Sequence, residues 1–285
     1  TSISVTVSAN VNPQVTKVSI SSGAFEASSS SVSVLGAGST AITLSGLIPN
    51  TAYTLKTRTE NYNNIASTET TVASTTTVSN NITVSGYKVN TTSAVITVNA
   101  NGNPDGTQIV VSTGSNNHFG VSLSSIGRIS GSLTTLTIFG LSTNTSYGLQ
   151  AGSLNVDGST NPVSVTGTTT TLSVSPVLVS FVMYNTSAAV TLGLNTNPAG
   201  TTLVITTGAF EVSSSSSGAV TTLTFSSLIP NTVYTILARS ENGTGAVSES
   251  ITAASTGTFA YVPGANSFTA VNITSISLQF GANNN

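Results

Sequence analysis

The side chains that could carry out catalysis are few and lie far apart along the chain. His118 is the single histidine, beside Ser115, Asn116 and Asn117, and the 8 acidic residues are scattered over 285 positions. Nucleophilic catalysis of the serine-protease kind needs a histidine between an acid and a nucleophile, and glycoside hydrolysis needs two paired carboxylates. No recurring spacing indicates either set. We therefore expect His118 to be an exposed loop residue and the chain not to be an enzyme.

Ligands for a metal ion or a cofactor are equally sparse. The chain has no cysteine, and Asp105 and Asp157 each stand alone at a turn, whereas a calcium loop carries acidic residues at alternate positions. Glu60 and Glu241 recur at equivalent places of a repeat, which favours a structural role shared by both copies. The sequence thus predicts no metal site and no cofactor.

Charge excludes some partners and favours another. Only 5% of the residues are charged, against about 25% in a typical soluble domain, and the formal net charge is -2. The 6 basic residues are scattered and form no patch, so nucleic acid is not an expected partner. No run reaches the 18 or so apolar residues of a membrane-spanning helix. A nearly neutral surface of Ser, Thr, Asn and Gly offers little repulsion between copies, so self-association is expected.

Asparagine in the pattern Asn-x-Ser/Thr gives the one recurring candidate for modification. Asn90, Asn185 and Asn272 each lie shortly before a repeated Thr-Ser strand, which makes them candidate glycosylation sites in register with the repeat.

The residues named above lie within a sequence unit of about 90 residues that is repeated along the chain, and this unit must position them. The stretch Leu-Ile-Pro-Asn-Thr-x-Tyr at 47–53 returns at 228–234, and a looser form ends at Tyr147. A second repeated element begins with Thr-Ser at positions 1, 92, 186 and 274. Two independent elements with the same period indicate tandem modules.

The pattern within each unit is that of β-strands. Ile3, Val5 and Val7 alternate with polar residues, a period of two that is typical of a strand with one buried face. About seven such segments fill each unit, separated by turn residues every 8 to 12 positions, as in a β-sandwich. Serine-rich runs at 28–31 and 213–217 are expected at an exposed edge or loop. No apolar helical period persists, so helix content is expected to be near zero.

We expect an all-β fold of three tandem immunoglobulin-like sandwiches plus the first strands of a fourth. The predicted boundaries are 1–79 for a module that lacks its first strand, 80–173 and 174–262 for two further modules, and 263–285 for a partial fourth module or strand-donating tail.

The motif Leu-x-Pro-x-Thr-x-Tyr resembles that of fibronectin type III modules, which carry it between their fifth and sixth strands. The resemblance implies that Tyr53, Tyr147 and Tyr234 form tyrosine corners, in which a buried ring directs its hydroxyl to backbone a few residues upstream. The chain lacks the tryptophan that family members usually carry, and Thr143 replaces the proline in the second copy. The Asn-Pro-x-Gly turn is similar to prokaryotic members. Sandwiches of other immunoglobulin-like topology stay open.

The phase of the repeat permits two interpretations. Residues 1–285 are either a window on a longer array, or the last segment donates a strand to the first module of another copy. The candidate strand-donor residues are Phe268, Val271, Ile276, Leu278 and Phe280.

Repetition without chemistry favours a structural function. The leading hypothesis is a repeat array in an extracellular, cell-surface fibre, sheath or adhesin stalk that associates with itself. The alternative is a set of spacer or binding modules of a larger secreted protein, with a glycan or a cell-surface protein as partner.

Overall fold

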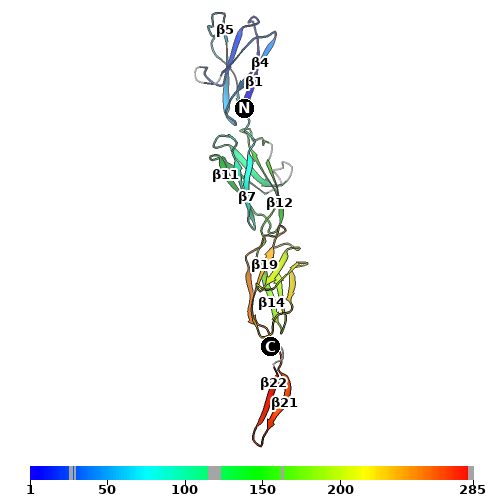
Figure 1. Cartoon of the computed structure of the whole chain (residues 1–285). Helices are drawn as coiled ribbons and strands as arrows, with labels where there is room; N and C mark the ends of the chain where they lie inside the picture. Colours follow the sequence, from blue (N-terminus) through cyan, green and yellow to red (C-terminus); the bar gives the residue numbers. More distant parts are fainter. Residues whose placement is uncertain (26–27, 29, 115–122, 162–163, 282–285) are drawn as a thin grey trace. The chain divides into compact units, whose positions relative to one another are not determined.

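Every regular element in the described part of the chain is a β-strand. The computed structural model describes residues 1–25, 28, 30–114, 123–161 and 164–281, with the side chains of 164–166, 265–268 and 280 left out. Figure 1 shows strands and connecting loops throughout, which confirms the all-β fold class.

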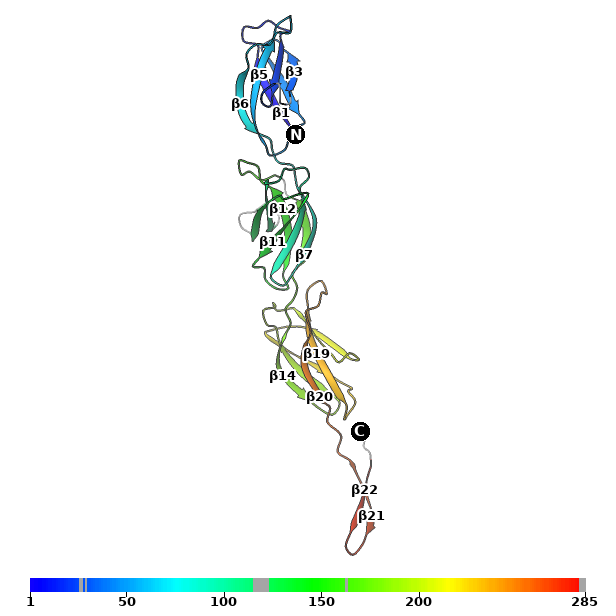
Figure 2. The same cartoon turned by 90° about the vertical axis from the view of Figure 1, so that its left-hand side faces the viewer.

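The first set of strands, as we call each pair of facing sheets, has six members (Figure 2): β1 (Ser2–Ser8), β2 (Lys17–Ser21), β3 (Ser30–Val34), β4 (Ser39–Ser45), β5 (Ala52–Glu60) and β6 (Thr70–Thr76). One sheet is β1-β4, and the other has the order β3-β2-β5-β6. Val18 and Ile20 of β2 pack with Ile42 and Leu44 of β4 in one buried cluster. Alternate residues of β4 are buried, so the predicted period of two is what fills this core.

The second set has seven strands: β7 (Thr83–Val89), β8 (Ser93–Asn99), β9 (Gln108–Thr113), β10 (Ser124–Arg128), β11 (Leu133–Phe139), β12 (Ser146–Ser153) and β13 (Ser164–Thr170). The sheet orders are β11-β8-β7 and β10-β9-β12-β13. Ile96, Ile109 and Leu149, one from each of three strands, have no exposed surface.

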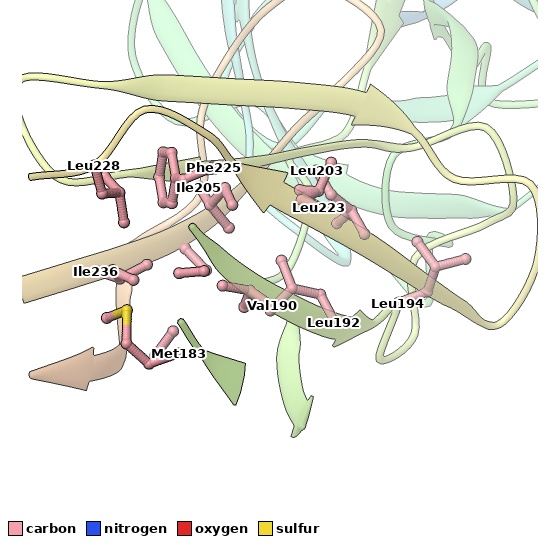
Figure 3. Packing of buried hydrophobic residues seen from close by; sticks show 13 residues of the cluster. Met183, Val190, Leu192, Leu194, Leu203, Ile205, Leu223, Phe225, Leu228 and Ile236 are labelled. Carbon is pink, nitrogen blue, oxygen red and sulfur yellow. The ribbon is translucent and has the colours of Figure 1, made fainter. Parts of the chain in front are cut away.

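The third set repeats this arrangement with β14 (Val177–Met183), β15 (Ala188–Gly193), β16 (Thr202–Thr206), β17 (Glu211–Ser215), β18 (Val220–Phe225), β19 (Val233–Glu241) and β20 (Ile251–Gly257). Its sheets are β14-β15-β18 and β17-β16-β19-β20. Figure 3 shows the buried residues between them, with Phe225 among the aliphatic side chains of both sheets.

Sheet order settles the topology that the sequence left open. In each set the strand after the second turn, β3, β10 or β17, pairs with the strand before it and forms the sheet edge. In the constant-type immunoglobulin order, the fourth strand instead joins the sheet of the first, second and fifth. Of the serine-rich runs, residues 30–31 therefore lie on edge strand β3 and residues 213–215 on edge strand β17, where side chains can stay in water.

The last two strands, β21 (Gly264–Val271) and β22 (Ile276–Gly281), pair only with each other within the described residues. They form an antiparallel hairpin with two irregularities in register. A two-stranded sheet of this kind is at best marginally stable by itself.

By compactness the chain divides into two units. Unit 1 comprises 1–88, 95–138 and 148–167, and unit 2 comprises 89–94, 139–147 and 168–285. Among the described strands, no sheet combines members of two of the four predicted sequence ranges. The module boundaries themselves stay a prediction.

Candidate interaction surfaces

The repeated tyrosines each accept a hydrogen bond from the backbone five residues upstream. The Tyr53 hydroxyl accepts from the Ile48 N–H at 2.9 Å, that of Tyr147 from Ser142 at 2.9 Å, and that of Tyr234 from Ile229 at 3.0 Å. The tyrosines stand at the start of β5, β12 and β19. In the second and third sets the motif therefore lies between the fifth and sixth strands.

We expect Tyr53→Phe to lower the free energy of unfolding by about 1 kcal/mol, because one hydrogen bond is lost while the ring stays packed. Differential scanning calorimetry of the whole chain measures the change. Tyr62→Phe is the matched control, since that side chain is fully exposed. Equal melting of both variants and the unchanged chain would contradict a bracing role for Tyr53.

A buried threonine closes each corner from the other side, and sequence reasoning missed it. The Thr171 hydroxyl donates to the Ser142 carbonyl at 2.7 Å and accepts from the Thr145 N–H at 3.0 Å. Thr77 and Thr258 make the same two bonds with their own corners. The signal was present, because each threonine follows its corner tyrosine by 24 residues. We call Thr77, Thr171 and Thr258 the clasp threonines.

Within unit 1, two loops of the second set grip the segment that precedes it. Asn103 accepts from the Asn80 N–H at 2.6 Å and donates to the Asn80 carbonyl at 2.8 Å. The Asn155 side chain accepts from the Ser79 N–H at 2.7 Å. The corner residue Asn50 donates to the Thr107 hydroxyl at 3.3 Å.

Within unit 2, the equivalent loops repeat two of these contacts, while Asn242, the equivalent of Asn155, donates a hydrogen bond where Asn155 accepts one. Asn197 accepts from the Val174 N–H at 2.8 Å and donates to its carbonyl at 2.6 Å. The corner residue Asn144 donates to the Thr201 hydroxyl at 2.8 Å, and Asn242 donates to the carbonyl of the clasp residue Thr171 at 3.2 Å. The chain thus builds the same joint twice from the same residue types.

The corresponding loops of the first set border an open cleft of about 730 Å³. Its lining includes Asn12 and Thr16, which match Asn103 and Thr107, and Asn61, which matches Asn155 and Asn242. The exposed side chains of Val15, Tyr62 and Ile65 add apolar surface. This cleft is called the joint cleft below.

The candidate glycosylation sites all lie in hairpin turns: Asn90 and Asn185 between the first two strands of the second and third sets, and Asn272 between β21 and β22. The amides of Asn90 and Asn272 donate to the hydroxyls of Ser93 and Ser275. The Asn185 amide instead donates to the carbonyls of Phe259 and Ala260, at 3.3 and 2.8 Å. Because a glycan is attached through this nitrogen, glycosylation of Asn185 would break at least one of those two hydrogen bonds. Asn272, in contrast, is an exposed residue that a glycan could reach.

The candidate strand-donor residues lie on β21 and β22. Val271, Ile276 and Leu278 expose 69%, 62% and 51% of their surface. The side chains of Phe268 and Phe280 lie outside the described part. These strands therefore present apolar side chains to solvent, and donation of a strand to another copy stays a proposal.

Several of the other described charged groups interact within their own loop or strand pair. Asp105 accepts from the Gly131 N–H, and Glu60 and Glu241 each begin a turn closed by an isolated bridge. The Ser159 hydroxyl and N–H lower the pKa of Asp157, and the Lys56 ammonium lowers that of Glu69. His118 lies outside the described residues. Among those that are described, no group of three potential metal ligands occurs, and no helix is long and apolar enough to cross a membrane.

Sequence comparison finds no match to a family model, and no curated protein is significantly similar. Among solved structures, a two-domain fibronectin type III segment of chicken tenascin is 16% identical with a TM-score of 0.42, covering 63% of this chain and all of that one. The FN1–FN3 domains of chicken CNTN1 are 15% identical with a TM-score of 0.30, covering 90% of this chain and 94% of that one.

Proposed function

We propose that this chain is a structural repeat array of an extracellular surface fibre, sheath or adhesin stalk of prokaryotic type, and that it associates with copies of itself. The observation that carries the proposal is the joint built twice from equivalent residues. In each case an asparagine side chain of one loop binds the N–H and the carbonyl of a single residue in the preceding segment. A corner asparagine also donates a hydrogen bond to a threonine hydroxyl of the next loop.

Such joints restrict the linker. Asn103 and Thr107 are 6% and 3% exposed, and Asn197 and Thr201 are 6% and 1% exposed. A buried amide that satisfies both the donor and the acceptor of one linker residue opposes local unwinding, because breaking it leaves buried polar groups unpaired. Linkers held in this way suit a chain that spans a distance or bears a load rather than one that closes around a substrate.

The surface supports association between copies. Charged groups are scarce, and apolar side chains such as Val220, Val233 and Phe139 are exposed on the strands. With so little net charge, electrostatic repulsion between copies is weak, and short-range polar and apolar contacts decide whether they bind.

Negative-stain electron microscopy of the purified 285-residue chain over a range of concentrations tests this function. We expect filaments with a regular repeat that lengthen as concentration rises. Because the contacts are mainly uncharged, the filaments should persist in high salt, where screening removes surface ion pairs. Dispersed single particles at every concentration would contradict the self-associating array.

A further inference from the structure

Asparagine followed directly by glycine occurs twice in the chain, at Asn101–Gly102 and at Asn242–Gly243. An asparagine side chain is chemically labile when the backbone nitrogen of the next residue attacks its amide carbon. Glycine makes this attack easiest, because it has no side chain to shield its nitrogen and its backbone turns freely. By sequence the two pairs should react alike, but the structure holds them very differently.

The joint of unit 2 holds Asn242 and Gly243 in place. Asn242 is 5% exposed, and its side-chain oxygen accepts three hydrogen bonds from its own turn, at 2.8 to 3.0 Å. Its nitrogen donates to the Thr171 carbonyl, and the Gly243 N–H donates to the Asn144 side chain at 3.0 Å. Because both reacting groups must turn toward each other, closure of a ring would have to break several of these bonds together.

Asn101 and Gly102 are far less restrained. Both residues are exposed, and the Gly102 N–H makes no hydrogen bond within the described residues. The Asn101 side chain has a single hydrogen bond in the described part of the chain, from its nitrogen to the Asn81 carbonyl at 2.8 Å. One hydrogen bond at an exposed site contributes little, so this pair reaches a reactive arrangement at small cost.

The third set contains the same turn without the glycine. Asn195 has the position of Asn101, with φ of 58° against 49°, and its nitrogen donates to the Ser175 carbonyl at 3.3 Å. The residue after it is Thr196, whose branched side chain crowds the attacking nitrogen. Asn195 is therefore a natural control that keeps the geometry and changes the neighbour.

We propose that Asn101 deamidates in the folded chain and that the carboxylate formed there loosens the grip of the second set on the segment before it. The Gly102 nitrogen loses its proton to hydroxide and bonds to Cγ of Asn101, while the Cγ–Nδ2 bond breaks and ammonia leaves. Water then opens the five-membered succinimide at either carbonyl and yields aspartate or isoaspartate at position 101. Water is the only reactant consumed. The proposal goes beyond the self-associating array and does not depend on it.

The new carboxylate cannot make the hydrogen bond that it replaces. An ionised carboxylate only accepts, so its oxygens would face the Asn81 carbonyl without a proton between them. The neighbouring Asn80 is the residue that Asn103 binds through its N–H and carbonyl, and the Asn80 side chain donates to the Asn101 carbonyl at 2.9 Å. Deamidation therefore removes an anchor of this segment directly beside the one that Asn103 supplies.

Peptide mapping by mass spectrometry tests the site. The whole chain is kept at mildly alkaline pH, either native or in concentrated urea, and is then digested with trypsin, which separates residues 89–128, 129–239 and 240–285. In the native chain we expect Asn101 to convert at least about tenfold faster than Asn242, a ratio that one or two hydrogen bonds suffice to produce. In urea the two should convert at similar rates, and Asn195 should be much slower than either.

Equal rates at Asn101 and Asn242 in the native chain would overturn the proposal. Conversion of both in urea and of neither in the native chain would overturn it as well. Asn144→Gly removes the acceptor of the Gly243 N–H and tolerates the positive φ of 44° at that position. This variant should speed conversion at Asn242 and leave Asn101 unchanged, whereas no effect at Asn242 would contradict protection by the joint.

Hydrogen exchange followed by NMR tests the effect on the joint. Asn101→Asp should speed exchange of the Asn80 N–H at least about fivefold, because local opening there becomes easier. Asn272→Asp is the matched control, since it adds the same charge at an exposed turn of unit 2 and should leave that rate unchanged. An unchanged rate in the Asn101 variant would overturn the loosened grip while keeping Asn101 as the site of deamidation.

Discussion

Replacing Phe225 by alanine should lower the free energy of unfolding of the third set of strands by about 3–5 kcal/mol. Phe225 ends β18 with 1% of its surface exposed, and it belongs to a cluster that joins residues of both sheets. Removing the ring loses its transfer free energy and leaves a cavity that fixed strands cannot fill (Figure 3). A typical domain is stable by 5–15 kcal/mol, so this change removes a large share.

Urea denaturation followed by circular dichroism measures the loss, since the chain has no tryptophan to report by fluorescence. Phe210→Ala is the matched control, because Phe210 lies in the same set with 37% of its surface exposed and should cost far less. Equal losses for the two variants would show that the ring of Phe225 does not hold the sheets together.

Thr171→Val should cost about 2–4 kcal/mol although valine matches threonine in shape. The substitution removes the partner of the Thr145 N–H and of the Ser142 carbonyl, and the valine that replaces fully buried Thr171 leaves no room for water to take its place. Each unsatisfied buried group costs about 1–3 kcal/mol, more than the hydrogen bond contributes when formed. Thermal unfolding by calorimetry measures the change.

Thr171→Ser keeps the hydroxyl and should retain most of that stability, so the two variants separate the bonds from the methyl group. The same pair at Thr77 should behave alike, because its hydroxyl makes equivalent bonds to Ile48 and Thr51. A valine variant as stable as the serine variant would contradict the clasp.

Local patterns in the sequence predicted the strands and their buried faces well. The alternation at Ile3, Val5 and Val7 is a strand with those residues facing the core, because the direction of a side chain in a strand depends only on parity. The start of the last strand is not readable from this alternation, because Val247 forms only an isolated bridge to Glu241 and β20 begins at Ile251.

Sequence alone determined the repeat, the all-β class and the tyrosines that mark each corner, because period and residue type are properties of the chain itself. Tertiary structure decided which strands share a sheet, that a threonine 24 residues after the tyrosine closes the corner, and that Asn103 and Asn197 grip the preceding segment. These depend on groups brought together across long sequence separations, where many pairings satisfy the same local pattern. The joint cleft at Asn12 and Thr16 was visible only once its two occupied equivalents could be compared with it.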